Sequence, residues 1–391
     1  MKDIFIVDAL RTPFGAFGGC LSDVPAPTLA AEVINALIER HAIPVDQVDE
    51  VIIGQVLQGG SGQAPARQAM RRAGLPDSVH AMTINKVCGS GLKAMMLAAN
   101  SISLGESDLV LAGGMESMSL SPYALPGARF GQRLGNGQTI DLLIYDALQD
   151  PYSNRHMGEI TEDWVTAHGV SREEQDAYAA RSYQRSQAAV KNGTFANELV
   201  SVIKSSRKGD ITVSEDEEPF RGNIEKLPGL RPVFSKTGTI TAGNASTIND
   251  GAGVAILVGS EAVAKFNLKP IARLVASSTN SLHPDLFAEA PVDAIRRCCA
   301  KADLKTDDIG LFEINEAFSA VPLVAIKQLG LDPERVNVNG GAVSLGHPVG
   351  ASGARLVATL LREMRARNEK YGLATLCIGG GEAVSAVFER V

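Results

Sequence analysis

The chain has 391 residues, long enough to form two or three domains that each bury a hydrophobic core. Hydrophobic residues make up 45% and charged residues 21% of the sequence, which is typical of globular proteins. The formal net charge of -7 excludes a nucleic-acid-binding protein with a broadly basic surface. The five cysteines lack the spacing of paired Cys-x-x-Cys metal sites, so we expect no metal and a reducing compartment.

The first residues, Lys-Asp-Ile-Phe-Ile-Val-Asp at positions 2–8, read as a strand and not as a targeting peptide. No apolar run approaches the roughly 18 residues that are needed to cross a bilayer. We therefore expect a cytoplasmic protein that has neither a membrane nor a nucleic acid as its partner.

Strand-like and helix-like segments alternate over residues 1–119. Apolar runs predict strands at 4–7, 51–56, 81–85 and 108–112, and amphipathic spacing predicts helices at 28–40, at 64–73 and after residue 90. This alternation is typical of an α/β layer with a mainly parallel sheet.

The pattern changes over residues 120–245. Glycine and proline interrupt residues 121–137, a charged helix is predicted at 172–192, and residues 209–218 form an acidic run with little strand character. We interpret this region as an inserted domain that forms a lid or wall beside a site. The first layer resumes at about 246–269.

The alternation returns over residues 270–391. Strands are predicted at 271–276, 309–314, 336–339 and 373–378, and helices at 292–302, 321–329 and 353–367. Val87 and Val349 begin similar motifs 262 residues apart, and the glycine runs at Gly113 and Gly379 lie 266 residues apart. These nearly equal spacings predict an internal duplication, with two similar halves and a ligand site at the strand ends between them.

Cys88 lies at a predicted corner between a strand and a helix, followed by Gly89, Ser90 and Gly91. Small residues leave space beside the sulfur, and the partial positive charge of a helix N-terminus favours a thiolate and a neighbouring oxyanion. By itself this pattern also fits a buried structural cysteine.

Three segments of the second half supply partners for such a nucleophile. Asn315 follows a predicted strand, His347 lies in a glycine-rich loop, and Cys377 ends a strand before Gly379. All three fall at strand ends, where α/β proteins assemble their sites. His347 also fits a structural loop histidine, and Cys377 a core thiol.

Four motifs together resemble the thiolase family: Asn-x-x-Cys-Gly-Ser-Gly-Leu at 85–92, Asn-Glu-Ala-Phe at 315–318, the Gly-His-Pro loop with its flanking glycines at 340–353, and Cys-Ile-Gly-Gly-Gly at 377–381. The resemblance covers the whole chain and, within the family, is greatest to the biosynthetic acetyl-CoA acetyltransferases. It implies a duplicated αβαβα layered core, with halves at 1–119 (resumed at 246–269) and 270–391, and a coenzyme A-binding loop domain at 120–245.

The resemblance also implies a mechanism: reversible Claisen condensation of two acetyl-CoA to acetoacetyl-CoA and coenzyme A. Cys88, activated by His347, takes the acetyl group, and Cys377 removes a proton from the second acetyl-CoA. One oxyanion site consists of His347 with a water held by Asn315, and the other of the backbone N–H groups of Cys88 and Gly379. Coenzyme A thioesters are substrates in this scheme, and no cofactor is expected.

Positions that match the family's substrate contacts lie in the insert and beside the motifs. They are Leu148, His156, Met157, Arg221, Leu230, Ala242, Gly243, Ser246, Phe287, Ala317 and Phe318. The sequence departs from the family's pattern at two places. Phe287 lies in an acyl-pocket loop that differs from the usual one, and Glu382-Ala383 stands where many members have a small or apolar pair.

Three alternatives remain open. A degradative 3-ketoacyl-CoA thiolase would use the same catalytic residues on longer chains. A decarboxylating enzyme of the ketoacyl synthase type would lack the second cysteine, so Cys377 argues against it. A non-catalytic acyl or lipid carrier on the same fold is expected to lose a cysteine or His347. The resemblance further suggests a homo-oligomer, a dimer or a tetramer, assembled through residues 121–137.

Overall fold

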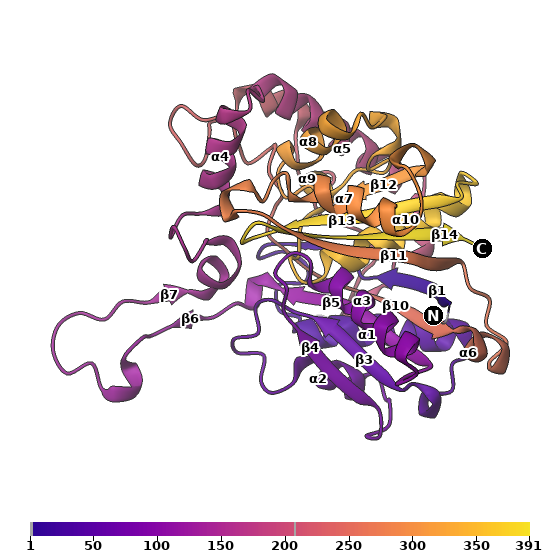
Figure 1. Cartoon of the computed structure of the whole chain (residues 1–391). Coiled ribbons are helices and arrows are strands. Elements are labelled where there is room, and N and C mark those ends of the chain that lie inside the picture. The colour runs from indigo at the N-terminus through magenta and orange to yellow at the C-terminus, as the bar shows by residue number, and fades with distance from the viewer. Residues whose placement is uncertain (1–2, 207–208) are drawn as a thin grey trace.

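A computed structural model describes residues 3–206 and 209–391 of the chain (Figure 1). The first half of the core contains five main strands and three helices: β1 (Ile4–Arg11), α1 (Ala26–His41), β3 (Glu50–Gly54), α2 (Pro65–Arg72), β4 (His80–Ile84), α3 (Ser90–Leu104), β5 (Leu109–Ser117) and β10 (Asn249–Gly259). The short strand β2 (Gly15–Ala16) pairs with β10. Helix α6 (Ser260–Lys265) leads from this half to the next.

The second half repeats this order of elements. It comprises β11 (Ala272–Ser281), α7 (Ala290–Lys301), β12 (Leu311–Ile314), α8 (Ala320–Leu329), α9 (Ala342–Leu345), α10 (Ser352–Ala366), β13 (Tyr371–Ile378) and β14 (Glu382–Arg390). The two halves lie one above the other, with the first half lower in Figure 1 and the second half above it.

Strand pairing repeats along with the element order. From the joint outward, the first half runs β1-β10-β5-β3-β4 and the second runs β11-β14-β13-β12, and β1 pairs with β11 where they meet. In each half the first two pairings are antiparallel and the next is parallel. The parallel contact between β3 and β4 has its counterpart in a single bridge from Phe312 to Val336. The chain therefore contains two copies of one unit.

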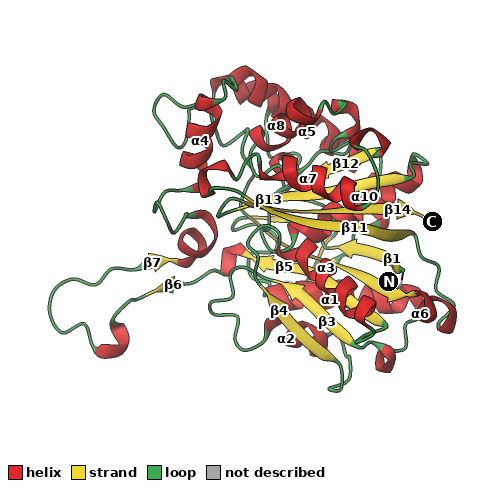
Figure 2. Cartoon of the chain, in the orientation of Figure 1, coloured by secondary structure: helices red, strands yellow, loops and turns green. Residues whose placement is uncertain are grey.

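Alternating side chains sort the structure into five layers (Figure 2). Val51 and Ile53 on β3 pack in one cluster with α1 and α2, while Ile52 points to the other face and packs with α3 and α10. On β12, Leu311 joins the α3 and α10 cluster, and Ile314 packs with α7 and α8. Helices α3 and α10 thus lie between the strands of the two halves, α1 and α2 cover the outer face of the first half, and α7 and α8 cover that of the second.

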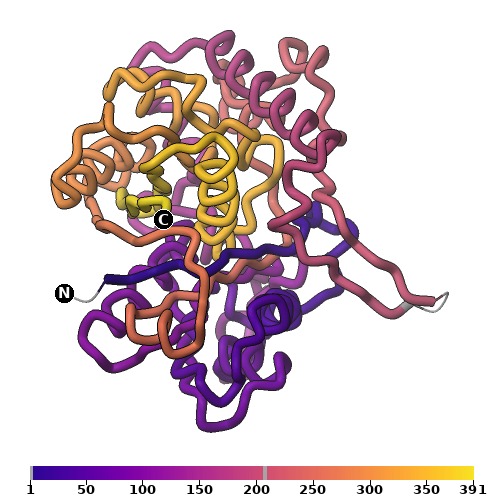
Figure 3. The backbone as a smooth tube through the Cα atoms, turned by 90° about the vertical axis from the view of Figure 1, so that its right-hand side faces the viewer, coloured from indigo at the N-terminus to yellow at the C-terminus, as the bar shows by residue number. Residues whose placement is uncertain are grey.

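The insert contributes the helices α4 (Met157–Ala167) and α5 (Arg172–Lys191) and two small hairpins, β6 (Tyr123–Ala124) with β7 (Ile140–Asp141) and β8 (Val202–Ser206) with β9 (Gly209–Val213). The segment carrying β6 and β7 extends far from the core in Figure 1, and the β8–β9 hairpin projects at the right of Figure 3. The domain boundaries predicted from the sequence stay a prediction.

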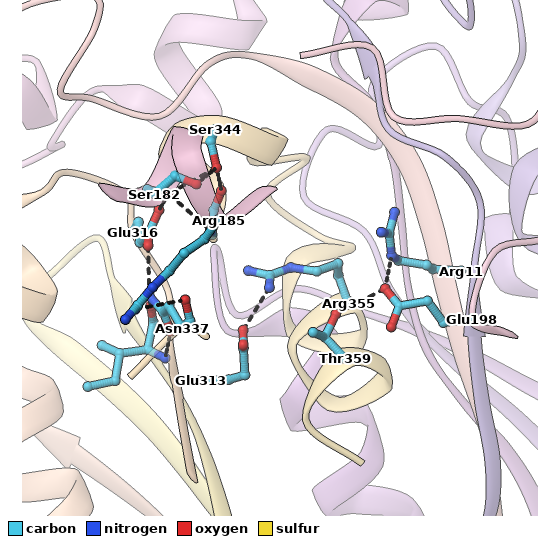
Figure 4. A network of polar contacts seen from close by, with 12 residues as sticks. Arg11, Ser182, Arg185, Glu198, Glu313, Glu316, Asn337, Ser344, Arg355 and Thr359 are labelled. Atoms are coloured by element: carbon cyan, nitrogen blue, oxygen red, sulfur yellow. Dashed lines mark hydrogen bonds and ion pairs between the residues drawn. The ribbon is translucent and has the colours of Figure 1, made fainter. Parts of the chain in front are cut away.

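A buried carboxylate fastens α5 to the second half. Glu316 accepts hydrogen bonds from Ser182 Oγ at 2.7 Å and from Asn337 Nδ2 at 2.9 Å (Figure 4). It also accepts one from the Tyr178 hydroxyl at 2.9 Å. A fully buried carboxylate stays charged at low cost only when such donors surround it. Because Glu316 directly follows Asn315, the same contacts hold the Asn-Glu-Ala-Phe motif in place.

Three sequence predictions were wrong in detail. Residues 336–339 form only isolated bridges, since Asn337 adopts a left-handed conformation with φ 48° that ends an extended run. Residues 209–213, expected to have little strand character, form β9. Gly113 and Gly114 lie inside β5, and a Cβ on Gly114 would come within 1.9 Å of the Gly350 carbonyl oxygen. Gly379, by contrast, begins a turn after β13. The two glycine runs are therefore not equivalent.

Candidate active site

Cys88 lies in a tight turn between β4 and α3, as the sequence predicts. Val87 has a φ of 45°, an unfavourable conformation for a β-branched residue. Local bonds hold it: its N–H donates to Asn85 Oδ1 at 2.9 Å, and its carbonyl accepts from Ser90 Oγ at 2.7 Å. Helix α3 begins at Ser90, so Cys88 lies just before the first turn.

The Cys88 thiol is protonated at rest. Burial raises its pKa to about 11. The Gly379 backbone N–H donates a hydrogen bond to the sulfur, which lowers the pKa, but the effect of burial is larger. At rest, burial therefore outweighs any stabilisation of the thiolate by the helix N-terminus. A base must remove the thiol proton when a substrate is present.

The His347 ring, which lines the same cavity as Cys88, is held through both of its nitrogens. Its Nδ1 lies 2.6 Å from Ser352 Oγ, and the Ser352 hydroxyl donates to the Pro348 carbonyl at 3.0 Å. Asn315 Nδ2 approaches His347 Nε2 at 3.4 Å. Both contacts assign the ring proton to Nδ1 and leave Nε2 as the basic nitrogen. Burial, assisted by the charge of Arg355, lowers the pKa of His347 to about 3, so the ring is neutral.

The side-chain amide of Asn315 also has an oxygen, Oδ1, near His347. Its Oδ1 is buried and, among the described residues, has no hydrogen-bond partner. A buried amide oxygen without a protein partner is unusual and marks a place where water or substrate is held.

Cys377 is the last residue but one of β13, in the opposite half of the molecule. Burial, and then the proximity of the Cys88 sulfur, raise the pKa of Cys377 well above its ordinary value. The two sulfurs therefore interact electrostatically, although 289 positions separate them in the numbering. The sequence suggested that Cys377 ends the last strand of the chain, but β14 follows it.

A cavity of about 280 Å³ unites these groups between the two halves. The predicted site residues in its wall are Cys88, Leu148, His156, Met157, Ser246, Phe287, Ala317, Phe318, His347, Cys377 and Gly379. The turn at 242–246, which the resemblance places at coenzyme A, also contributes Ala245, whereas sequence reasoning missed Met118, Ala147, Val233, Phe234, Thr247, Ile248 and Val349. Phe234 stacks on the His156 ring at 4.8 Å, and no motif marks it in the sequence.

A second cavity, of about 470 Å³, extends the first toward the surface. The two share Val233, Phe234 and residues 245–248, and the outer one also contains Arg221 and Ala242. Arg221 is 53% exposed and pairs with Glu217 at 3.0 Å. The shared residues place the two cavities next to each other.

Two predicted contacts lie in neither cavity. Leu230 packs beside Tyr183 and Leu227, and a Cβ on Gly243 would lie 2.4 Å from the Leu227 side chain. Both residues therefore pack behind the residues that line the cavities. Asn315 also stands behind His347 and not in the wall itself.

Glu116 joins the two halves directly beneath the site. Its carboxylate accepts hydrogen bonds from the N–H groups of Val56 at 3.0 Å, Leu57 at 3.1 Å and Gly350 at 2.9 Å, and burial raises its pKa to about 7. The sequence contained Glu116 only as part of a glycine-rich run, so this link was not predicted.

Within residues 3–206 and 209–391, no group of three or more His, Cys, Asp or Glu side chains is arranged to hold a metal ion. Over the same residues, no helix has both the length and the apolar character that crossing a bilayer requires.

A duplicated α/β core with two cysteines and a neutral imidazole in one pocket defines an enzyme that carries acyl groups on sulfur. Residues 4–261 match the family model "Thiolase, N-terminal domain", and residues 268–390 match "Thiolase, C-terminal domain". The chain belongs to the thiolase family, which confirms the resemblance seen in its motifs.

Curated relatives are similar over their full length. An acetyl-CoA acetyltransferase of Chromobacterium violaceum is 48% identical over 99% of this chain and 100% of its own, and one of Cupriavidus necator is 47% identical over 100% of both. A probable acetyl-CoA acyltransferase of Staphylococcus aureus is 46% identical over 100% of both.

Among solved structures, the crystal structure of the Bacillus anthracis acetyl-CoA acetyltransferase superposes with a TM-score of 0.97. It is 41% identical and covers 100% of this chain and 99% of its own. This similarity confirms the predicted α/β fold class.

Proposed function

We propose that the chain catalyses the reversible condensation of two acetyl-CoA to acetoacetyl-CoA and coenzyme A through an acetyl-Cys88 intermediate. The observation that carries the proposal is the single pocket in which Cys88, His347 and Cys377 meet. The names of the relatives, acetyl-CoA acetyltransferases at 47–48% identity over full length, support acetyl-CoA as the substrate.

In the first half-reaction, His347 Nε2 accepts the Cys88 proton, and the sulfur attacks the thioester carbonyl. The carbon–sulfur bond to coenzyme A then breaks, and Cys377 gives its proton to the departing thiolate. A thiol with a strongly raised pKa is a weak acid but, once deprotonated, a strong base. This step therefore prepares Cys377 for the next one.

In the second half-reaction, the Cys377 thiolate removes a methyl proton from a second acetyl-CoA. The enolate carbon attacks acetyl-Cys88, the bond to Cys88 breaks, and the imidazolium of His347 returns a proton to the released thiolate. Every proton is thus back in its original place.

Each developing oxyanion needs donors that are already in position. We propose that protonated His347, with a water held by Asn315 Oδ1, stabilises the oxygen of the incoming thioester. The N–H groups of Cys88 and Gly379 serve the oxygen of the acetyl-enzyme. Loss of one such donor typically costs about 3 kcal/mol of transition-state stabilisation. The thioester supplies the activation, so we propose that no cofactor is required.

The cavity supports a short acyl group, because about 280 Å³ is at the lower end of the roughly 300–1,000 Å³ of ligand pockets. Thiolysis rates should therefore be highest with acetoacetyl-CoA and fall with chain length. A steady-state profile of kcat/KM over 3-ketoacyl-CoA chains tests this. Much faster cleavage of octanoyl-length substrates would instead assign the degradative function.

Phe287 is expected to limit acyl length. It is 2% exposed, lines the cavity and meets Phe318 edge-on at 6.2 Å. In Phe287→Ala, kcat/KM for a hexanoyl-length ketoacyl-CoA should rise ~10-fold relative to acetoacetyl-CoA, because space for added methylenes is worth 1–3 kcal/mol. Phe287→Met fills the space and should retain the original preference. An unchanged ratio in the alanine variant, with the fold verified by its melting temperature, would show that other residues set the length.

Titration of Cys88 and His347 themselves should leave the rate of Cys88 acetylation nearly independent of pH from ~5 to ~9, so any change in this range should follow Glu116, whose pKa is about 7. The lowered pKa of His347, about 3, keeps its ring a neutral base far below the usual ~6.5, and the base is lost only as pH falls toward that lower value. The raised pKa of Cys88, about 11, prevents spontaneous ionisation over the same range. Quenched-flow acetylation rates measure this. A single titration with a midpoint near 6.5 that arises from His347 itself would contradict the neutral-base assignment.

We further propose a cytoplasmic homo-oligomer, a dimer or a tetramer. The projecting segment between η2 (Met118–Leu120) and β7 exposes several large apolar side chains, the kind of surface that protein contacts cover, namely Tyr123, Leu125, Phe130 and Leu134. The five cysteines carry free thiols, a state that a reducing compartment preserves. Light scattering on the purified protein gives the oligomeric state.

A further inference from the structure

Glu382, one of the two departures in the sequence, lies beside the active site. It begins β14 directly after the glycine turn 379–381, and its carboxylate pairs with the Lys86 ammonium. The other carboxylate oxygen accepts a hydrogen bond from Ser281 Oγ at 3.1 Å. Side-chain exposure is 22% for Lys86 and 32% for Glu382, so the pair is partly withdrawn from water.

This ion pair connects the two loops that form one oxyanion site. Lys86 precedes Cys88 by two residues in the first half of the chain, and Glu382 follows Gly379 by three in the second. The Gly379 N–H already donates to the Cys88 sulfur. Any movement of one loop relative to the other therefore changes the spacing of the two N–H groups.

Each loop has an unusual backbone conformation. Gly380 and Gly381 have φ values of 89° and 85°, in a region where glycine is unrestricted, and Val87 is held at a strained φ of 45°. On the inner side the loops are packed together, since a Cβ on Gly89 would lie 2.5 Å from Ile378 Cδ1. The outer side is joined by the Lys86–Glu382 pair.

Glu382 also balances a local excess of positive charge. Lys93, on the first turn of α3, has a pKa lowered by burial and then by the charge of Lys86, while Glu382 acts in the opposite direction. Without the carboxylate, the two lysines would repel each other beside the Cys88 turn.

We propose that Lys86 and Glu382 are positioning residues, whose ion pair clamps the Cys88 turn to the glycine turn and so sets the distance between the N–H groups of Cys88 and Gly379. The inference rests on the proposed function, which gives these N–H groups the acetyl oxygen. Neither side chain contacts the substrate pocket. The pair therefore acts on the rate of acyl transfer and not on substrate binding.

The test compares Glu382→Gln, Lys86→Gln and the exchanged pair Lys86→Glu with Glu382→Lys. Each single variant should lower the rate constant of Cys88 acetylation about tenfold, since misplaced oxyanion donors lose much of their effect. KM for acetyl-CoA should change less than about twofold, and the exchanged pair should recover most of the lost rate. The matched control is Glu389→Gln. Glu389 lies on β14, as Glu382 does, but far from Cys88, and the substitution breaks its 2.6 Å ion pair with Arg273 on β11. It should acetylate at the unmodified rate.

Single variants that acetylate at the unmodified rate, or an exchanged pair no faster than the singles, would overturn the clamp. A rise in KM with an unchanged rate constant would also overturn it, because it would assign Lys86 to coenzyme A binding. Failure of the unmodified protein to become acetylated would refute the proposed function itself. Intact-protein mass spectrometry distinguishes these outcomes, and melting temperatures verify that each variant is folded.

Discussion

Replacing Cys88 by alanine should abolish acetylation and lower both condensation and thiolysis by a factor on the order of 10⁴ or more. Among the described residues, the other cysteine in the pocket is Cys377, which the proposed mechanism uses as proton donor and base. The loss should appear in kcat, since the thiol forms a covalent bond that exists only after binding. Rates of acetoacetyl-CoA thiolysis, with intact mass after incubation with acetyl-CoA, measure it.

Cys20→Ala is the control for this prediction. Cys20 is partly buried near Glu217, which raises its pKa together with burial, and it lines no cavity around Cys88. The control should retain unmodified rates. If Cys88→Ala kept activity within about tenfold of the unmodified enzyme, the nucleophile would have to be another residue.

Replacing Cys377 by alanine should separate the two half-reactions. Cys88 and His347 remain, so the acetyl-enzyme still forms, more slowly because the departing thiolate must take its proton from water. Condensation should fall by a factor on the order of 10³ or more, since no base removes the methyl proton of the second acetyl-CoA. The variant should therefore accumulate the acetylated protein.

Exchange kinetics verify the separation. Transfer of label between acetyl-CoA and free coenzyme A requires only the first half-reaction, so it should persist in Cys377→Ala while acetoacetyl-CoA production stops. Condensation at the unmodified rate would remove Cys377 from the mechanism. Loss of both reactions, in a variant that melts normally, would make Cys377 part of the acetylation step alone.

The layered core follows from local sequence. The continuous apolar run Val51, Ile52 and Ile53 predicts a strand that is covered on both faces, and the structure packs these side chains on alternate faces against helices. The corner at Cys88 is equally local, because a strand signal ends where small residues and helical spacing begin. Periodicity and turn chemistry act over a few residues, so one chain is sufficient to show them.

What the sequence did not predict depends on contacts between distant segments. The resting thiol of Cys88 results from burial by both halves, which outweighs the local helix effect that favours a thiolate. The left-handed Asn337 is held by hydrogen bonds of its side chain to Ile314 and Glu316, and so interrupts an apolar run that reads as a strand. Phe234 reaches the pocket from a loop with no motif of its own. Such positions are determined by packing.

One measurement tests the central claim most directly: peptide mapping of Cys377→Ala protein after incubation with isotopically labelled acetyl-CoA. The account predicts one acetyl group per chain, on the peptide that contains Cys88, and its removal by added coenzyme A. An acetyl group on Cys20, Cys298 or Cys299, or no stable acetyl group on any cysteine, would contradict acyl transfer through Cys88 in the pocket between the two halves.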